Sequence, residues 1–135
     1  MNDYLITNMD INILPNDINY VVYPAIYQHF KKKFYATMFV TKPLLTFNRN
    51  SIVYPTYLEA DFTEIQDTKI KVILKDNNWY HIVDHESMNY EMVIYKSLYD
   101  DHIPYARPKS MFESLIDKEE YSDIKQKWRF ELVTY

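Results

Sequence analysis

Residues 70–83 read Ile-Lys-Val-Ile-Leu-Lys-Asp-Asn-Asn-Trp-Tyr-His-Ile-Val, and this stretch decides the fold class. It contains two runs rich in β-branched and aromatic residues, Ile70–Leu74 and Trp79–Val83, on either side of Asp76-Asn77-Asn78. Two such runs separated by a short turn of Asn and Asp are typical of a β-hairpin. We therefore predict a pair of antiparallel strands here.

Strand signals of the same kind recur along the chain. The other predicted strands are Tyr20–Tyr23, Phe34–Val40, Ile52–Leu58, Met92–Tyr99, Tyr105–Arg107 and Trp128–Val133. One helix is predicted after Pro108, where Ser110 and Glu113 form a capping-box pair and apolar residues follow at helical spacing. Several short strands with a single small helix indicate a mostly β (α+β) fold, a small partly closed barrel, with a two-layer α+β sandwich as the alternative.

The composition excludes several classes of site. The 135 residues include no cysteine and no glycine. Without cysteine, the chain offers no disulfide, no Cys-ligated zinc and no thiol nucleophile. Without glycine, it lacks the phosphate-binding loops, dinucleotide fingerprints and nucleophile elbows that need this residue. Turns with positive φ must then use Asn and Asp, the next most tolerant residues.

The charge and hydropathy patterns favour a cytoplasmic protein. The net charge is −4, and no apolar run approaches the ~20 residues that a membrane span needs. Residues 81–135 carry seven basic and eleven acidic residues, a balance that disfavours nucleic acid as a partner. The abundance of Asn, Ile, Tyr and Lys is typical of an AT-rich genome, so we expect a low-GC bacterium, or its phage or mobile element, as the source.

Residues 85–101 run His-Glu-Ser-Met-Asn-Tyr-Glu-Met-Val-Ile-Tyr-Lys-Ser-Leu-Tyr-Asp-Asp. This stretch resembles the core motif of the bacterial family catalogued as domain of unknown function 1653, which has His-Ser-Glu-Thr, an apolar strand and then Leu-Tyr-Gly-Asp. The family continues with Val-Arg-Pro, Met-Phe and Arg-Phe-Glu. The matching residues here are Ala106-Arg107-Pro108, Met111-Phe112 and Arg129-Phe130-Glu131.

An upstream block, Tyr27–Lys31, resembles the family's opening Tyr-x-His-Phe-Lys-Gly, with Lys32 in place of the glycine. The glycine before the family's aspartate is likewise Asp100. The resemblance implies a small SH3-like β-barrel and implies no activity. About 40 residues separate the first strand from the His motif. We therefore expect a single domain, 1–135, with family-like blocks 20–41 and 79–133 and an inserted β excursion at about 42–69.

Two patterns bear on catalysis and metal binding. Asp84-His85-Glu86 places two carboxylates beside an imidazole, so His85 and Glu86 are candidate acid–base residues. His81 and His85 have the four-residue spacing of a helical metal site, but in a strand they would lie roughly 13 Å apart. We therefore expect neither a metal site nor a cofactor.

The candidate binding residues are two arginines and a set of aromatic side chains. Arg107 and Arg129 could form an anion- or carboxylate-binding fork, or structural ion pairs with Glu91, Asp101 or Glu131. Tyr95, Tyr99 and Trp79 are suited either to core packing or to an interaction surface. Lys31, Lys32 and Lys33, flanked by aromatic residues, indicate a solvated hairpin tip or a contact with single-stranded nucleic acid.

Together these patterns favour a non-catalytic binding module over an enzyme. We expect it to recognise a protein partner or a small polar ligand through Tyr95, Tyr99, Arg107, Arg129 and Trp79. One version is a phage- or element-encoded inhibitor of a host factor. The alternatives are a small enzyme or nucleotide-processing domain that uses His85 and Glu86, and a single-stranded nucleic-acid binder that uses Lys31–Lys33.

Overall fold

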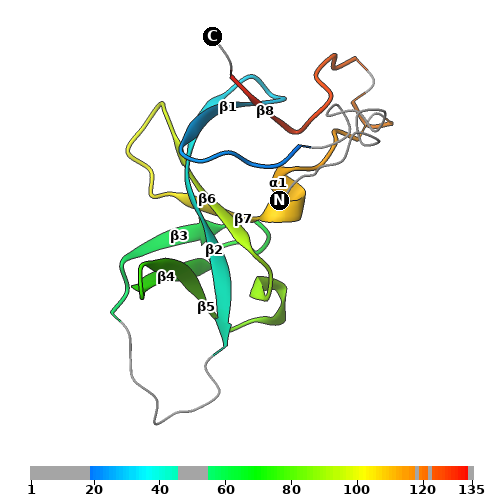
Figure 1. The fold of residues 1–135 in the computed structure, drawn as a ribbon. Coiled ribbons are helices and arrows are strands. Elements are labelled where there is room, and N and C mark those ends of the chain that lie inside the picture. Colours follow the sequence, from blue (N-terminus) through cyan, green and yellow to red (C-terminus); the bar gives the residue numbers. More distant parts are fainter. Residues whose placement is uncertain (1–18, 46–54, 118, 122, 134–135) are drawn as a thin grey trace, which may run out of the picture.

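The computed structural model describes residues 19–45, 55–117, 119–121 and 123–133, which form eight strands, one short helix and one 3-10 turn (Figure 1). The strands are β1 (Ala25–His29), β2 (Phe34–Leu45), β3 (Leu58–Phe62), β4 (Lys69–Lys75), β5 (Asn78–Val83), β6 (Met92–Ser97), β7 (Tyr105–Pro108) and β8 (Phe130–Leu132). The 3-10 turn is Glu86–Met88 and the helix α1 is Lys109–Phe112. No described helix has the length and hydrophobicity needed to span a membrane.

Strand β2 closes the sheet into a barrel. It pairs antiparallel with β6 along residues 35–41 and in parallel with β5 along residues 42–45. The other neighbours run β5-β4-β3-β7-β6, so six strands form a closed ring. The first part of β2 pairs with β1, and β8 extends the sheet beyond β1. The predicted mostly β fold, a small barrel with one short helix, is confirmed.

The hairpin predicted at residues 70–83 is also confirmed. Strands β4 and β5 pair antiparallel and are joined by Asp76 and Asn77 alone. These two residues have φ angles of 52° and 65°, the left-handed conformation that a two-residue hairpin turn requires. Asp and Asn therefore do here what glycine does in most proteins, as the composition requires.

Strand β6 is buried on both faces and separates two hydrophobic cores. Met92 and Ile94 lie in the barrel interior, whereas Val93 and Tyr95 alternate with them and face the other side. The barrel core comprises Phe39, Ala60, Phe62, Ile70, Val72, Met88, Met92, Ile94 and Ala106. The second core comprises Tyr27, Val93, Tyr95, Phe112 and Phe130. The β1–β8 extension and α1 therefore cover a second, outer apolar layer.

The side chain of His81 is fully buried in β5 and links three segments of the chain. Its Nε2 lies 2.7 Å from the Met88 carbonyl oxygen, and its Nδ1 lies 2.7 Å from the Thr41 hydroxyl oxygen. Because the carbonyl can only accept, Nε2 carries the proton and Nδ1 accepts from Thr41. Burial lowers the pKa of His81, which favours this neutral form. The imidazole therefore holds the 3-10 turn against the junction of β5 and β2.

Two local predictions are wrong. Tyr20–Tyr23 is not a strand, because side chains rather than a neighbouring strand bind its backbone: the Val21 N–H donates to the Glu113 carboxylate and the Val22 N–H to the Tyr27 hydroxyl. The predicted capping box does not form, because the Glu113 carboxylate accepts from the Val21 N–H. Helix α1 begins at Lys109, has Pro108 as its N-cap residue and has no side-chain cap.

The segment 42–69 contributes strands to the barrel on both sides of an undescribed stretch. Residues 42–45 end β2, and β3 pairs with both β4 and β7. Of the predicted strand Ile52–Leu58, residues 52–54 lie outside the described residues, residues 55–57 form no strand, and Leu58 is the first residue of β3. That this segment is an insertion relative to the family stays a prediction.

We predict that Thr41→Val lowers the free energy of unfolding by about 1–3 kcal/mol, because it leaves the buried Nδ1 of His81 without a donor. Urea unfolding followed by circular dichroism measures this loss. Thr63→Val is the matched control, since among the described residues the Thr63 hydroxyl donates to its exposed neighbour Glu64. Equal stability of the two variants would contradict the structural role assigned to the Thr41–His81 pair.

Candidate functional site

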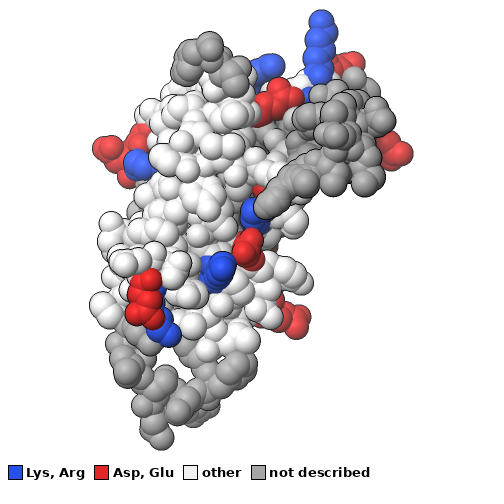
Figure 2. Space-filling model, in the orientation of Figure 1, with Lys and Arg blue, Asp and Glu red and all other residues white. Residues whose placement is uncertain are grey.

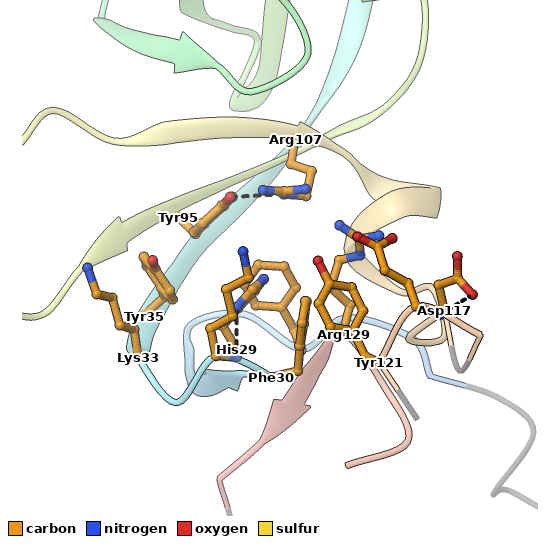
Figure 3. A pocket seen from close by; sticks show the side chains of 12 residues that line it. His29, Phe30, Lys33, Tyr35, Tyr95, Arg107, Asp117, Tyr121 and Arg129 are labelled. Carbon is orange, nitrogen blue, oxygen red and sulfur yellow. Dashed lines mark hydrogen bonds between the residues drawn. The ribbon is translucent and has the colours of Figure 1, made fainter. Parts of the chain in front are cut away.

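A pocket of about 570 Å³ lies where the β1–β2 turn, strands β6 and β7, and the C-terminal segment meet. Figure 3 shows its side chains, with Lys33 and Tyr35 on one side, Arg129, Tyr121 and Asp117 on the other, and Arg107 facing His29 and Phe30. Its lining residues are His29, Phe30, Lys31, Lys33, Tyr35, Tyr95, Arg107, Asp117, Glu120, Tyr121, Arg129 and Phe130.

The β1–β2 turn supplies two lysines to this pocket. Lys32 adopts a φ of 79°, and its N–H donates to the His29 carbonyl at 2.7 Å. This left-handed conformation is costly for a residue with a Cβ and easy for glycine, so the expectation that turns with positive φ use Asn and Asp is wrong at Lys32. Lys31 and Lys33 line the pocket, whereas Lys32 does not.

The two arginines reach the pocket in different ways. The Arg107 Nε donates to the Tyr95 hydroxyl at 3.0 Å, and its guanidinium lies 5.5 Å from the centre of the Phe130 ring. The Arg129 Nε is buried and has no hydrogen-bond partner among the described residues. A buried polar nitrogen without a partner costs free energy, which a ligand acceptor would offset.

Neither arginine forms a salt bridge within the described part of the chain. This contradicts the expected ion pairs with Glu91, Asp101 or Glu131. The Glu131 carboxylate instead accepts from the backbone N–H groups of Lys127 and Trp128. Both guanidinium groups therefore keep donors that no described carboxylate occupies.

Positive charge dominates the pocket lining. Four side chains are cationic, Lys31, Lys33, Arg107 and Arg129, whereas two are acidic, Asp117 and Glu120. The Asp117 carboxylate is partly satisfied, because it accepts from the N–H groups of Glu119 and Glu120. The lining therefore has an excess of two positive charges with His29 neutral.

His29 is held neutral at the base of this positive site. Burial, and then the charges of Arg107, Arg129 and Lys31, lower its pKa to about 4. Its Nδ1 accepts from the Lys31 N–H at 3.1 Å, so the ring proton lies on Nε2 in the neutral form. His29 can therefore donate from Nε2 to a ligand.

Tyr95 can also act as a donor. Its hydroxyl accepts from Arg107, which leaves its own proton without a partner among the described side chains. Burial raises the pKa of Tyr95, so the phenol stays protonated. Guanidinium, imidazole and phenol groups thus converge as hydrogen-bond donors, an arrangement suited to an oxyanion.

The structure brings together some of the predicted site residues and separates others. Tyr95, Arg107 and Arg129 meet in the pocket, and Lys31 and Lys33 join them. Tyr99 lies elsewhere, where its hydroxyl accepts from the Phe34 N–H. Trp79 stacks on Phe39 at 4.0 Å against the barrel core.

The candidate acid–base pair His85 and Glu86 does not line this pocket. The His85 Nδ1 caps the 3-10 turn by accepting from the Ser87 N–H at 3.1 Å. His85 therefore makes a local hydrogen bond to the backbone of the 3-10 turn and takes no part in the pocket. Among the described residues, no group of three or more His, Asp or Glu side chains is arranged to hold a metal ion.

Seven lining residues were not predicted as site residues from the sequence. They are His29, Phe30, Tyr35, Asp117, Glu120, Tyr121 and Phe130. His29 and Phe130 lie within the family-like motifs Tyr27–Lys31 and Arg129-Phe130-Glu131, so those motifs carried a signal for them. Tyr121 contacts Phe30 at a ring distance of 4.8 Å across nearly a hundred residues of sequence, and no local pattern indicates that contact.

The comparisons with known proteins agree with part of the sequence resemblance. No curated protein and no solved structure matches the chain. One family model does match, and its description assigns no function. The match covers residues 76–132, which run from the β4–β5 turn through β8, so the Tyr27–Lys31 block lies outside it. The C-terminal part of the chain, residues 76–132, thus matches the family described as Protein of unknown function (DUF1653).

Proposed function

We propose that this protein is a non-catalytic binding module that holds an anionic group, a phosphate or a carboxylate, in the pocket between Arg107 and Arg129. The observation that carries the proposal is the buried Nε of Arg129, which has no partner among the described residues and lines the same pocket as the Arg107 guanidinium, which forms no salt bridge with a described carboxylate. Guanidinium forks suit such oxyanions because they offer two parallel donors.

The aromatic wall of the pocket and the mixed charges on the molecular surface support a binding site confined to this pocket. Aromatic rings form part of the pocket wall, and such less polar surroundings strengthen electrostatic attraction to a bound anion. Elsewhere, on the face of the molecule in Figure 2, the described Lys and Arg side chains lie among Asp and Glu on a mostly uncharged surface. This favours one bound anionic group over a long nucleic-acid backbone, which needs clustered cations along its path.

A protein partner or a small polar ligand, as expected from the sequence, could present such a group. The cytoplasmic location, the bacterial or phage origin and the inhibition of a host factor remain part of the proposal. They rest on composition and on the presence of a binding pocket.

We predict that Arg129→Gln weakens binding of sulfate and phosphate by about 10- to 100-fold, since hydrogen bonds to charged groups contribute about 1.5–3 kcal/mol. Isothermal titration calorimetry at low ionic strength measures the affinity. Because the Arg129 Nε has no partner in the free protein, we expect the melting temperature of the ligand-free variant not to fall.

The matched control is Lys71→Gln, which removes the same charge from an exposed residue of β4 outside the pocket. Within the β1–β2 turn, Lys32→Gln serves as a control for Lys33→Gln, because only Lys33 lines the pocket. Affinities that fall equally in all four variants would indicate general attraction to a cation-rich surface and would contradict the proposed site.

We also predict that sulfate binds more tightly as the pH falls from 7 to 5. The pKa of His29 is about 4 in the free protein, and a bound anion offsets the positive charges that lower it. The bound state then takes up a proton within this range, so affinity rises as the proton concentration rises. Sulfate is the suitable probe because it keeps its charge over the whole range.

The pH profile needs a variant that isolates His29. Asp117 and Glu120 also line the pocket, and proton uptake by either carboxylate would change sulfate binding in the same direction. His29→Asn keeps a neutral polar side chain and removes the titration, so we expect it to flatten the part of the profile between pH 7 and 5. A profile that is unchanged in this variant would assign the pH dependence to the carboxylates.

A further inference from the structure

A second pocket of about 460 Å³ adjoins the anion site. The two share Tyr35, Tyr95 and Arg107 as a common wall. The rest of the second pocket comes mainly from β3 and the β3–β4 turn, and its other lining residues are Asp61, Phe62, Thr63, Ile65, Gln66, Asp67, Thr68, Lys69 and Tyr105. A ligand held by Arg107 could therefore extend from the first pocket into the second.

The charge of the second pocket differs from that of the first. Its two cations, Lys69 and Arg107, are balanced by Asp61 and Asp67. Asp61 is already paired, with Lys69 Nζ at 2.8 Å and His102 Nε2 at 3.1 Å. The second pocket therefore suits a neutral group, not a second anion.

The polar side chains of the β3–β4 turn can both donate and accept hydrogen bonds. The Gln66 amide is exposed and offers both donors and an acceptor. The Thr63 and Thr68 hydroxyls already donate to the Glu64 carboxylate and to the Gln66 carbonyl, so they offer acceptor lone pairs. Such a mixture of donors and acceptors matches the edge of a heterocycle better than it matches an aliphatic chain.

The wall between the pockets offers aromatic ring surface. Tyr95 is 2% exposed and forms its floor, whereas Tyr35 and Tyr105 are only partly buried. Tyr35 meets Tyr105 edge-on at a ring distance of 6.3 Å, and His102 stacks on Tyr105 at 4.8 Å. A planar group that enters the second pocket would pack against Tyr35 and Tyr105.

We propose that the ligand is a nucleotide, with its phosphate between Arg107 and Arg129 and its base in the second pocket against Tyr35 and Tyr105. This inference rests on the proposed anion site and adds the class of ligand. The combined pockets are far larger than an inorganic anion, and they place an anionic end and a neutral, ring-lined end side by side. A free mononucleotide and one unit of a single strand share this chemistry.

The test compares ligands that differ by one part. Calorimetric titration of the full chain uses inorganic phosphate, ribose 5-phosphate and the four ribonucleoside monophosphates. We expect at least one monophosphate to bind about tenfold more tightly than ribose 5-phosphate, the size of effect that base–aromatic stacking gives. A single-stranded pentanucleotide distinguishes the two sources. If it binds more tightly than the monophosphate and with a steeper salt dependence, the site belongs to a single strand. If the two bind equally, the site belongs to free nucleotide.

Variants then separate the two pockets. Gln66→Ala and Tyr105→Leu should weaken the preferred monophosphate several-fold and leave ribose 5-phosphate unchanged, whereas Arg129→Gln should weaken both. Gln66 is exposed, so its variant tests the second pocket even where Tyr105→Leu lowers stability. Melting temperatures of each variant check the fold, and Lys71→Gln is the charge control.

The possible failures are distinguishable. Monophosphates that bind no more tightly than ribose 5-phosphate, with Arg129-dependent binding of both, would overturn the nucleotide and retain the anion site. An acidic or phosphorylated peptide that binds more tightly than every nucleotide would have the same effect. Absence of binding by every anion, phosphate and sulfate included, would overturn both proposals.

Discussion

The pairing of β2 is the constraint on which the rest of this structure depends. One edge of this strand pairs with β6, while the other edge pairs first with β1 and then with β5. The second half of β2 closes the barrel, and the first half carries the β1–β8 extension outside it. A slip of one residue in this register would reverse the faces of the strand and disrupt both apolar layers.

The outer layer explains how a cationic pocket persists in a small domain. Phe112 and Phe130 stack at a ring distance of 4.1 Å, and Tyr95 packs against both. Phe130 follows Arg129 in the chain, and the Arg107 guanidinium lies over the Phe130 ring, so this packing positions the two guanidinium groups without a salt bridge to a described carboxylate. A site built in this way keeps its charge available for a ligand, at the cost of bringing like charges together.

Much of the fold could be predicted from short-range patterns. The hairpin around Asp76-Asn77 and the strand at β6 follow from alternation and turn chemistry, which are local. The short helix was predicted, but its cap was not, because Glu113 binds the backbone of a segment that is more than ninety residues earlier in the chain. Tyr20–Tyr23 has strand propensity, and the same long-range contact overrides it.

The site was predictable only in part, because it too depends on contacts between residues that are distant in the sequence. Arg107, Arg129 and Tyr95 could be named from the family-like motifs, but their convergence depends on the pairing of β1 with β8. His29 lies in a motif that can be recognised in the sequence, but its lowered pKa cannot be predicted from it. That pKa arises from burial and mainly from the charges of arginines distant in sequence. Trp79 and Tyr99 have the composition of interface residues, yet tertiary packing places them away from the pocket.

The pairing of β1 with β8 joins segments that are about one hundred residues apart, at Gln28 and Glu131. Contacts of such sequence separation close late in folding, because the loop entropy must be lost before they form. During synthesis, strands β2–β7 leave the ribosome before β8. The lysines of the β1–β2 turn are therefore present before Arg129 completes the pocket. Occupancy of the pocket would therefore depend on this late pairing, and any ligand that binds there would stabilise the contact between β1 and β8.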